Sequence, residues 1–239
     1  MAKKTIITAA VTGAWPKKEN NPNVPLTPSE IAEDVYECWK AGAAVAHLHM
    51  RDDAGNGTMD KEKFRETLEL LKLRHPGCNI ILNLTTSGDL AATDETRQVH
   101  LEELRPEMAS YDCGSMNWLN SSLFINSPKF LEELGNNMQE WNIKPEIEVF
   151  DPGMIANAAY YLKKGVLRAP LHFQFCMGCA NGIPGTMKNP GIYEGNDGKP
   201  LPKLYLELFR CGTLRHGNAL RHRCHGRPCP GGDGGQCTL

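Results

Sequence analysis

Short apolar runs of strand length alternate with longer amphipathic stretches over the first 189 residues, and this alternation constrains the fold most strongly. Parallel neighbouring strands need a crossover, normally a helix, so the order predicts an α/β protein with a mainly parallel sheet. Strands are expected at residues 6–11, 44–49, 79–84, 107–111, 146–150 and 171–175. A doubly wound sheet can use these six strands, whereas a closed (β/α)8 barrel needs two more strand–helix units.

Helices are expected between these strands. The first has a clear start signal, because Thr27 can cap it, Pro28 fits the first helical position and Glu30 completes a capping box. A second apolar stripe runs through Phe64 and Leu71. Further helices are expected at residues 95–104, 128–141 and 153–164.

Composition excludes several classes of protein. The chain is 41% apolar and 23% charged with a formal net charge of −2, which is typical of a globular protein with a sizeable core and not of a disordered chain. No run approaches the roughly 20 apolar residues of a membrane span. The near-neutral charge argues against a nucleic-acid partner. The start of the chain is typical of a strand and not of a signal peptide, so a cytoplasmic location is expected.

Polar side chains gather at the ends of the expected strands, where α/β barrels carry their chemistry. They are Thr12, His47, His49, Thr85, Thr86, Ser110, Asp112 and Glu148. The two common nucleotide-binding fingerprints, a Gly-x-Gly-x-x-Gly after the first strand and a P-loop, are both missing from the sequence.

His47 and His49 form the candidate metal site. Residues two apart on a strand point to the same side, about 6.5–7 Å apart at Cα, so their imidazoles can converge on one zinc ion. The alternative is a hydrogen-bonded pair of histidines facing a polar barrel mouth. A catalytic zinc usually takes three protein ligands, and neither His100 nor His172 has a local pattern that marks it as the third. Cys176 and Cys179 are interpreted as reduced cysteines in a turn, the alternative being a redox or zinc pair.

Several strings of the chain, in order, resemble motifs of the beta-keto acid cleavage enzymes, over about residues 5–189. The strings begin at Ile7 (ITAAVTGA), Asn21 (NPNVPLTP), His47 (HLHMR), Pro106 (PEMAS) and Pro145 (PEIEV). The resemblance implies a zinc-dependent (β/α)8 TIM barrel that converts a β-keto acid and acetyl-CoA into acetoacetate and a new CoA thioester. It further implies a homotetramer, and a role in amino-acid degradation such as lysine fermentation.

The resemblance also assigns site residues. It implies that His47 and His49 bind Zn²⁺ and that Glu148 is a strand-end carboxylate supporting the catalytic base. It places Thr85, Gly88 and Ser110 among the groups that face the substrate. Trp15 departs from the lysine-pathway member, which has an acidic residue there, so an aminated keto acid is not assured as the substrate.

The last 50 residues differ from the rest. Residues 190–239 hold 10 of the 23 glycines, 4 of the 9 cysteines and 3 of the 8 histidines. In the family, one motif supplies the third zinc ligand, the catalytic Asp and a conserved Arg. This motif is missing from the sequence of residues 190–239. Back-translation of residues 205–217 and 225–237, read one base later, can give family-like sequence that includes Gly-Gly-His-Val-Arg. We therefore expect an incomplete barrel at residues 1–189, a frameshifted and disordered tail at 190–239, and little cleavage activity in the chain as printed.

Two other functions stay open from the residues alone. The paired histidines also suit a metal-dependent hydrolase or aldolase, which acetyl-CoA dependence would distinguish from an acyl transferase. A genuinely divergent tail can instead be a non-enzymatic zinc module, although its spacings match no common zinc finger. Its candidate ligands are Cys211, His216, His222, Cys224, His225, Cys229 and Cys237.

Overall fold

A computed structural model describes residues 6–184 and 204–210, whose centre is one seven-stranded parallel sheet. Its strands, in spatial order, are β1 (Thr8–Ala10), β2 (Val45–Leu48), β5 (Ile81–Leu84), β6 (Met108–Asp112), β9 (Lys144–Val149), β10 (Leu171–Met177) and β11 (Leu204–Arg210). The spatial order equals the chain order, without the reversal that defines a doubly wound sheet. The six predicted strands are confirmed, and the sheet is that of a part-formed TIM barrel.

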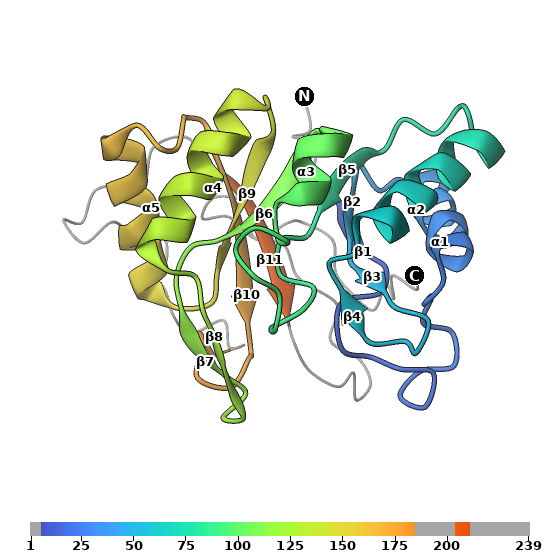
Figure 1. Ribbon diagram of the computed structural model, residues 1–239, viewed down its shortest axis with the longest axis horizontal. Helices are drawn as coiled ribbons and strands as arrows, with labels where there is room; N and C mark the ends of the chain where they lie inside the picture. Colours follow the sequence, from blue (N-terminus) through green and yellow to red (C-terminus); the bar gives the residue numbers. More distant parts are fainter. Residues whose placement is uncertain (1–5, 185–203, 211–239) are drawn as a thin grey trace, which may run out of the picture.

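Within the described residues, five helices connect the strands from β1 to β10. They are α1 (Pro28–Lys40), α2 (Lys61–Arg74), α3 (Val99–Leu104), α4 (Pro128–Glu140) and α5 (Pro152–Lys164). In Figure 1, α1 and α2 lie beside β1, β2 and β5, while α4 and α5 lie beside β9 and β10. Among the described residues, no helix has both the length and the apolar character needed to cross a membrane.

Two small hairpins were not predicted from the sequence. One pairs β3 (Met50–Arg51) with β4 (Gly57–Thr58), and the other pairs β7 (Met116–Trp118) with β8 (Ser122–Phe124). Each follows the carboxyl end of a sheet strand, and β7–β8 lies near the lower edge of the view in Figure 1. Strands of two or three residues are too short to show a hydrophobic period, which explains why they were missed.

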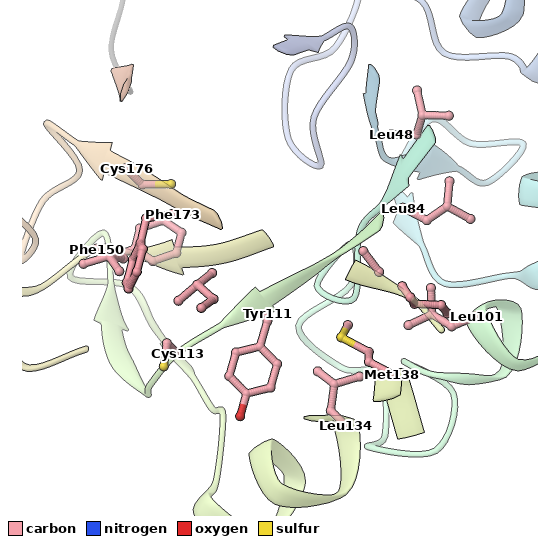
Figure 2. Close-up of a cluster of buried hydrophobic side chains, with 14 of the residues drawn as sticks. Leu48, Leu84, Leu101, Tyr111, Cys113, Leu134, Met138, Phe150, Phe173 and Cys176 are labelled. Atoms are coloured by element: carbon pink, nitrogen blue, oxygen red, sulfur yellow. The ribbon is translucent and has the colours of Figure 1, made fainter. Parts of the chain in front are cut away.

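Along each sheet strand, successive side chains alternate between an apolar face that packs against the helices and a polar face on the other side. Tyr111 of β6 points toward Leu134 and Met138 of α4 (Figure 2), and its hydroxyl donates to the Leu131 carbonyl at 2.8 Å. Its neighbour Asp112 belongs to the opposite face. Successive strand residues point to opposite faces, so the polar residues of neighbouring strands are collected on one surface.

Part of the predicted aberrant tail forms a strand. Residues 204–210 make β11, which pairs with β10 in a seven-residue parallel register from Leu171↔Leu204 to Met177↔Arg210. Residues 185–203 and 211–239 lie outside the described part of the chain, and with them lies most of the segment predicted to be frameshifted and disordered.

The predicted capping box at the start of α1 is confirmed. The Thr27 hydroxyl accepts from the Glu30 amide at 3.2 Å, and the Glu30 carboxylate accepts from the amides of Thr27 and Leu26 at 3.1 and 2.8 Å. Lys18 Nζ lies 2.9 Å from the same carboxylate. The Leu26 amide, followed by Lys18, lowers the pKa of Glu30 to about 2.

Glu30→Gln is expected to destabilise the protein by about 1 kcal/mol at neutral pH, a value limited by the solvent exposure of the site. A depressed carboxyl pKa contributes stability above the unfolded value of 4.5, and this contribution is lost as the pH falls through about 2. The difference in unfolding free energy between wild type and variant should therefore shrink between pH 4.5 and pH 2. Urea titrations across this range measure it. Glu69→Gln on exposed α2 surface is the control, and an equal loss there would contradict the prediction.

Candidate metal centre

The polar face of the sheet gathers a compact set of titratable side chains. His47 comes from β2, Asp112 from β6, Glu146 and Glu148 from β9, and Cys176 from β10, and all five are buried. The parallel registers set Asp112 beside Glu148 and Ser110 beside Glu146. Because four of these residues lie in the carboxyl halves of their strands, and Glu146 lies near the middle of β9, the cluster is toward the end of the sheet where α/β barrels hold their chemistry.

His47 and His49 converge as predicted. The Nε2 atoms of the two rings lie 3.2 Å apart, with the ring centroids at 5.1 Å. β2 ends at Leu48, so His49 stands in the short break before β3 and still points to the same side as His47. Two nitrogen ligands on one tetrahedral zinc ion, each at about 2.0–2.1 Å, lie about 3.3 Å apart. The separation therefore suits two ligands of a single cation.

Glu146 fixes the orientation of His47. Its Oε2 atom lies 2.8 Å from His47 Nδ1, and Asn83 Nδ2 lies 3.2 Å from the same nitrogen. A carboxylate on Nδ1 holds the proton there and leaves Nε2 to bind a metal, as in the carboxylate–histidine–metal arrangements of many proteins. Sequence analysis missed Glu146 and Asn83. The two-residue spacing of Glu146 and Glu148 on one strand was the available signal for Glu146.

Glu148 stands on the other side of the His47 ring. Its Oε1 atom is 3.9 Å from His47 Nε2, and Cys176 Sγ lies 3.6 Å from its Oε2 atom. Burial, reinforced by the charge of Asp112, raises the pKa of Glu148 well above its ordinary value. Burial likewise raises the pKa of Asp112. Two neighbouring buried carboxyl groups thus favour protonation or a nearby cation.

Without a metal ion, the carboxylates around His47 favour a proton on this ring, which faces His49. Burial disfavours a charged His47, but Glu146 and then Glu148 outweigh it and raise the pKa of His47 to about 9. Burial and the charge on His47 lower the pKa of His49 well below its ordinary value. These opposite shifts favour a proton on His47 over one on His49, and the 3.2 Å separation of the two Nε2 atoms suits a hydrogen bond between the rings.

The donor set fits a divalent cation. His47, Glu146 and Glu148 each offer one ligand atom, and these three atoms lie within 4.8 Å of one another. All three residues are buried. A second imidazole nitrogen, that of His49, faces the same point. Two imidazoles with carboxylates are ligands that zinc accepts, although other divalent metals accept them too.

The predicted substrate-facing residues lie together in the turn after β5 and on β6. Ser110 Oγ accepts from the Thr86 amide at 2.9 Å, and Thr85 Oγ1 lies 3.2 Å from Ser87 Oγ. The Gly88 amide faces Met59 Sδ at 3.1 Å. Thr85, Gly88 and Ser110 are all buried. The hydrogen bonds of Thr86 with Ser110 and of Thr85 with Ser87 hold the turn in place.

Arg97 links this turn to the segment at residues 125–126 through hydrogen bonds. Its Nε donates to the Thr86 carbonyl at 2.6 Å, and its other nitrogens donate to the Ile125 carbonyl at 3.1 Å and to Asn126 Oδ1 at 2.6 Å. The guanidinium stacks 4.0 Å from the Phe130 ring centroid. A planar fork with several donors suits this task better than an ammonium.

Other candidates from the sequence lie elsewhere or have structural contacts. His100 Nε2 donates to the Thr85 carbonyl at 2.9 Å and its ring stacks on Phe64, so it is not placed as a third ligand. His172 is in register with Glu146 on the adjacent strand. Neither Cys176 nor Cys179 is in a disulfide, but Cys176 lies in β10 and not in a turn, and Cys179 follows the end of that strand. Trp15, in the loop after β1, is 57% exposed.

The fold is that of a part-formed α/β barrel, and the strand ends carry a buried cluster of residues that could hold a metal ion. Residues 4–200 match the family of beta-keto acid cleavage enzymes. The chain therefore belongs to the beta-keto acid cleavage enzyme family, which confirms the resemblance seen in its motifs.

Named relatives agree with this assignment. The chain is 43% identical over 178 residues to the 3-keto-5-aminohexanoate cleavage enzyme of Fusobacterium nucleatum, covering 74% of this chain and 64% of that protein. It is 37% identical over 184 residues to the 3-oxoadipate:acetyl-CoA acetyltransferase of Cupriavidus necator, covering 77% and 63%. The chain thus spans a little under two thirds of the length of these relatives.

A solved structure shares the fold. The apo structure of ObcA superimposes with a TM-score of 0.60 at 27% sequence identity, covering 66% of this chain and 37% of that protein. A second ObcA structure, its binary complex with oxaloacetate, matches with a TM-score of 0.59.

Proposed function

We propose that this chain derives from, and carries the metal-binding half of, an acyltransferase that cleaves a β-keto acid with acetyl-CoA. The α-carbon of the keto acid forms a bond to the acetyl carbonyl carbon, and its bond to the β-carbonyl carbon breaks. The coenzyme A thiolate passes to that β-carbonyl carbon. The products are acetoacetate and a new acyl-CoA, so atoms and electrons balance without an oxidant.

One observation carries this proposal: two imidazole nitrogens converge at 3.2 Å, at the strand ends of a chain that belongs to this family. His47 and His49 would hold Zn²⁺, which is our proposal for the metal. When bound, such a cation polarises a ketone and stabilises the negative charge that develops during carbon–carbon cleavage.

The chain's own residues would divide the remaining work. Glu146 keeps the Nδ1 proton of His47 and so fixes its tautomer. Glu148, a buried carboxylate at the end of β9, would support the catalytic base. Thr85 and Ser110 would orient the keto acid, with Gly88 shaping the turn that carries Thr85. Trp15 would influence which keto acid binds, because it supplies no counter-charge for a substrate ammonium.

An assay for acetoacetate tests the function. The printed chain is compared with a chain whose reading frame is restored after Asn189, each with β-keto acids and acetyl-CoA. We expect negligible product from the printed chain and acetyl-CoA-dependent product from the restored chain. The physical reason is that the family motif missing from the printed sequence would supply further catalytic groups.

The same assay separates the alternatives. Keto acid consumption that does not need acetyl-CoA would favour the metal-dependent hydrolase or aldolase and reject the transferase. Equal cleavage by both chains would contradict the incomplete barrel at residues 1–189 and the frameshifted tail at 190–239. The homotetramer also remains a prediction, which light scattering of both chains would measure.

A further inference from the structure

The paired histidines provide two protein ligands, whereas a catalytic zinc usually takes three. We propose that Glu148 supplies the third ligand in this chain, so that a divalent cation is held by His47, His49 and Glu148 without any residue beyond β9. The inference deepens the proposed function and rests on it only for the presence of a cation at the histidine pair.

Geometry favours Glu148. Its Oε1 atom lies 3.9 Å from His47 Nε2, the same nitrogen that faces His49 Nε2 at 3.2 Å. Ligand atoms on a tetrahedral zinc ion lie about 3.3 Å apart, so a side-chain adjustment of less than about 1 Å brings the carboxylate into place. Rotation about the terminal bond of a Glu side chain is broad and supplies that adjustment without moving β9.

Glu146 is the competing carboxylate, and its position argues for a different role. It bonds to His47 Nδ1 at 2.8 Å, on the side of the imidazole away from Nε2. A ligand and its orienting partner divide the two ring nitrogens in this way. Glu146 is therefore a positioning residue for His47, and Glu148 is the residue that can reach the cation.

Cys176 directs the Glu148 carboxylate. Its thiol lies 3.6 Å from Oε2, while the other oxygen, Oε1, is the one nearer to His47. A thiol that donates to one carboxylate oxygen leaves the other available to a metal. Asp112, in register beside Glu148, adds negative charge, which a dication would offset.

The ligand set can be tested by titrating the purified full chain with Co²⁺, which replaces zinc and absorbs visible light. We expect bands typical of tetrahedral nitrogen and oxygen ligation, lost in the His47→Ala/His49→Ala variant. Glu148→Gln should change the band positions and weaken Co²⁺ binding more than about 100-fold. Glu146→Gln, the matched control on the same strand, should keep the band shape and weaken binding about 10–100-fold, as outer partners do.

The absorption spectrum of the Co²⁺ complex also reveals whether a cysteine is a ligand, because thiolate ligands add sulfur-to-cobalt charge-transfer bands in the near ultraviolet. Cys176→Ser should therefore keep the visible bands that depend on the histidine pair. A charge-transfer band that disappears in Cys176→Ser together with those visible bands would identify Cys176 as the ligand and overturn the proposal. Wild-type band shape and affinity in Glu148→Gln would overturn it too.

Folding of each variant is checked by circular dichroism. If Glu148→Gln does not fold, Glu148→Asp replaces it: the shortened carboxylate should shift the visible bands, and unchanged bands would reject Glu148 as a ligand. No keto acid or acetyl-CoA is present in the titration. A chain that binds Co²⁺ through these three residues but cleaves nothing after frame restoration would thus reject the proposed function while supporting the ligand set.

Discussion

Replacing His47 and His49 with alanine in the frame-restored chain is expected to lower kcat/KM for acetyl-CoA-dependent cleavage about 1000-fold. The two imidazoles converge at 3.2 Å and are the proposed anchors of the cation. Charge stabilisation by a metal ion is worth several kcal/mol, and about 4 kcal/mol corresponds to a factor of roughly 1000 in rate. Steady-state kinetics with saturating acetyl-CoA measure the loss.

His75→Ala is the matched control for this experiment. His75 lies at the end of α2, stacked on Tyr36 with the ring centroids 3.7 Å apart, and contacts Glu33 on α1. Its loss should leave cleavage nearly unchanged. More than a tenth of wild-type activity in a folded double variant would contradict the assignment of the metal ligands.

Gly57→Ala is expected to lower the free energy of unfolding by about 3 kcal/mol, which is large for a single added methyl group. A Cβ at Gly57 would stand 2.1 Å from the Gly88 carbonyl oxygen and 3.1 Å from that of Ala14. Both are backbone atoms, so neither can yield by rotating a side chain. The first residue of β4 here meets the loops that follow β1 and β5, and the substitution must separate the three segments.

Gly77→Ala provides the comparison, since a Cβ there meets nothing within 4 Å. Its effect should stay within about 0.5 kcal/mol, as for ordinary surface substitutions. Chemical denaturation of wild type and both variants gives the values. In thermal unfolding, 3 kcal/mol corresponds to a fall in Tm of roughly 6–12 °C for a protein of this size. Equal stability of the two variants would contradict the close packing of β4 against the loops that follow β1 and β5.

The local features of this protein were predictable from its sequence. The capping box of Thr27 and Glu30 formed as expected because its partners lie three residues apart. The six main strands also formed near their predicted positions, because each combines an apolar run with clear flanking signals. His47 and His49 converge because a two-residue spacing on an extended chain fixes their common side.

The rest of the metal centre could not be derived from spacing. Glu146 meets His47 across 99 residues of sequence, and Asn83 meets it across 36. Which residues of different strands become neighbours depends on the register of the sheet, and a shift of one residue would turn each side chain to the opposite face. The hairpins β3–β4 and β7–β8 could not be predicted either, because their strands are too short to show a hydrophobic period. Their positions depend on where the preceding sheet strands end.

The sequence by itself therefore determined the strand–helix order, the first helix cap and the paired imidazoles. Each depends on residues only a few positions apart, whose relation is set by the geometry of one element. The tertiary structure decided that Glu146 would orient His47, that Glu148 would face its other nitrogen, and that Gly57 would leave no room for a methyl group. Those relations exist only after distant strands pair, because parallel pairing fixes which side chains meet.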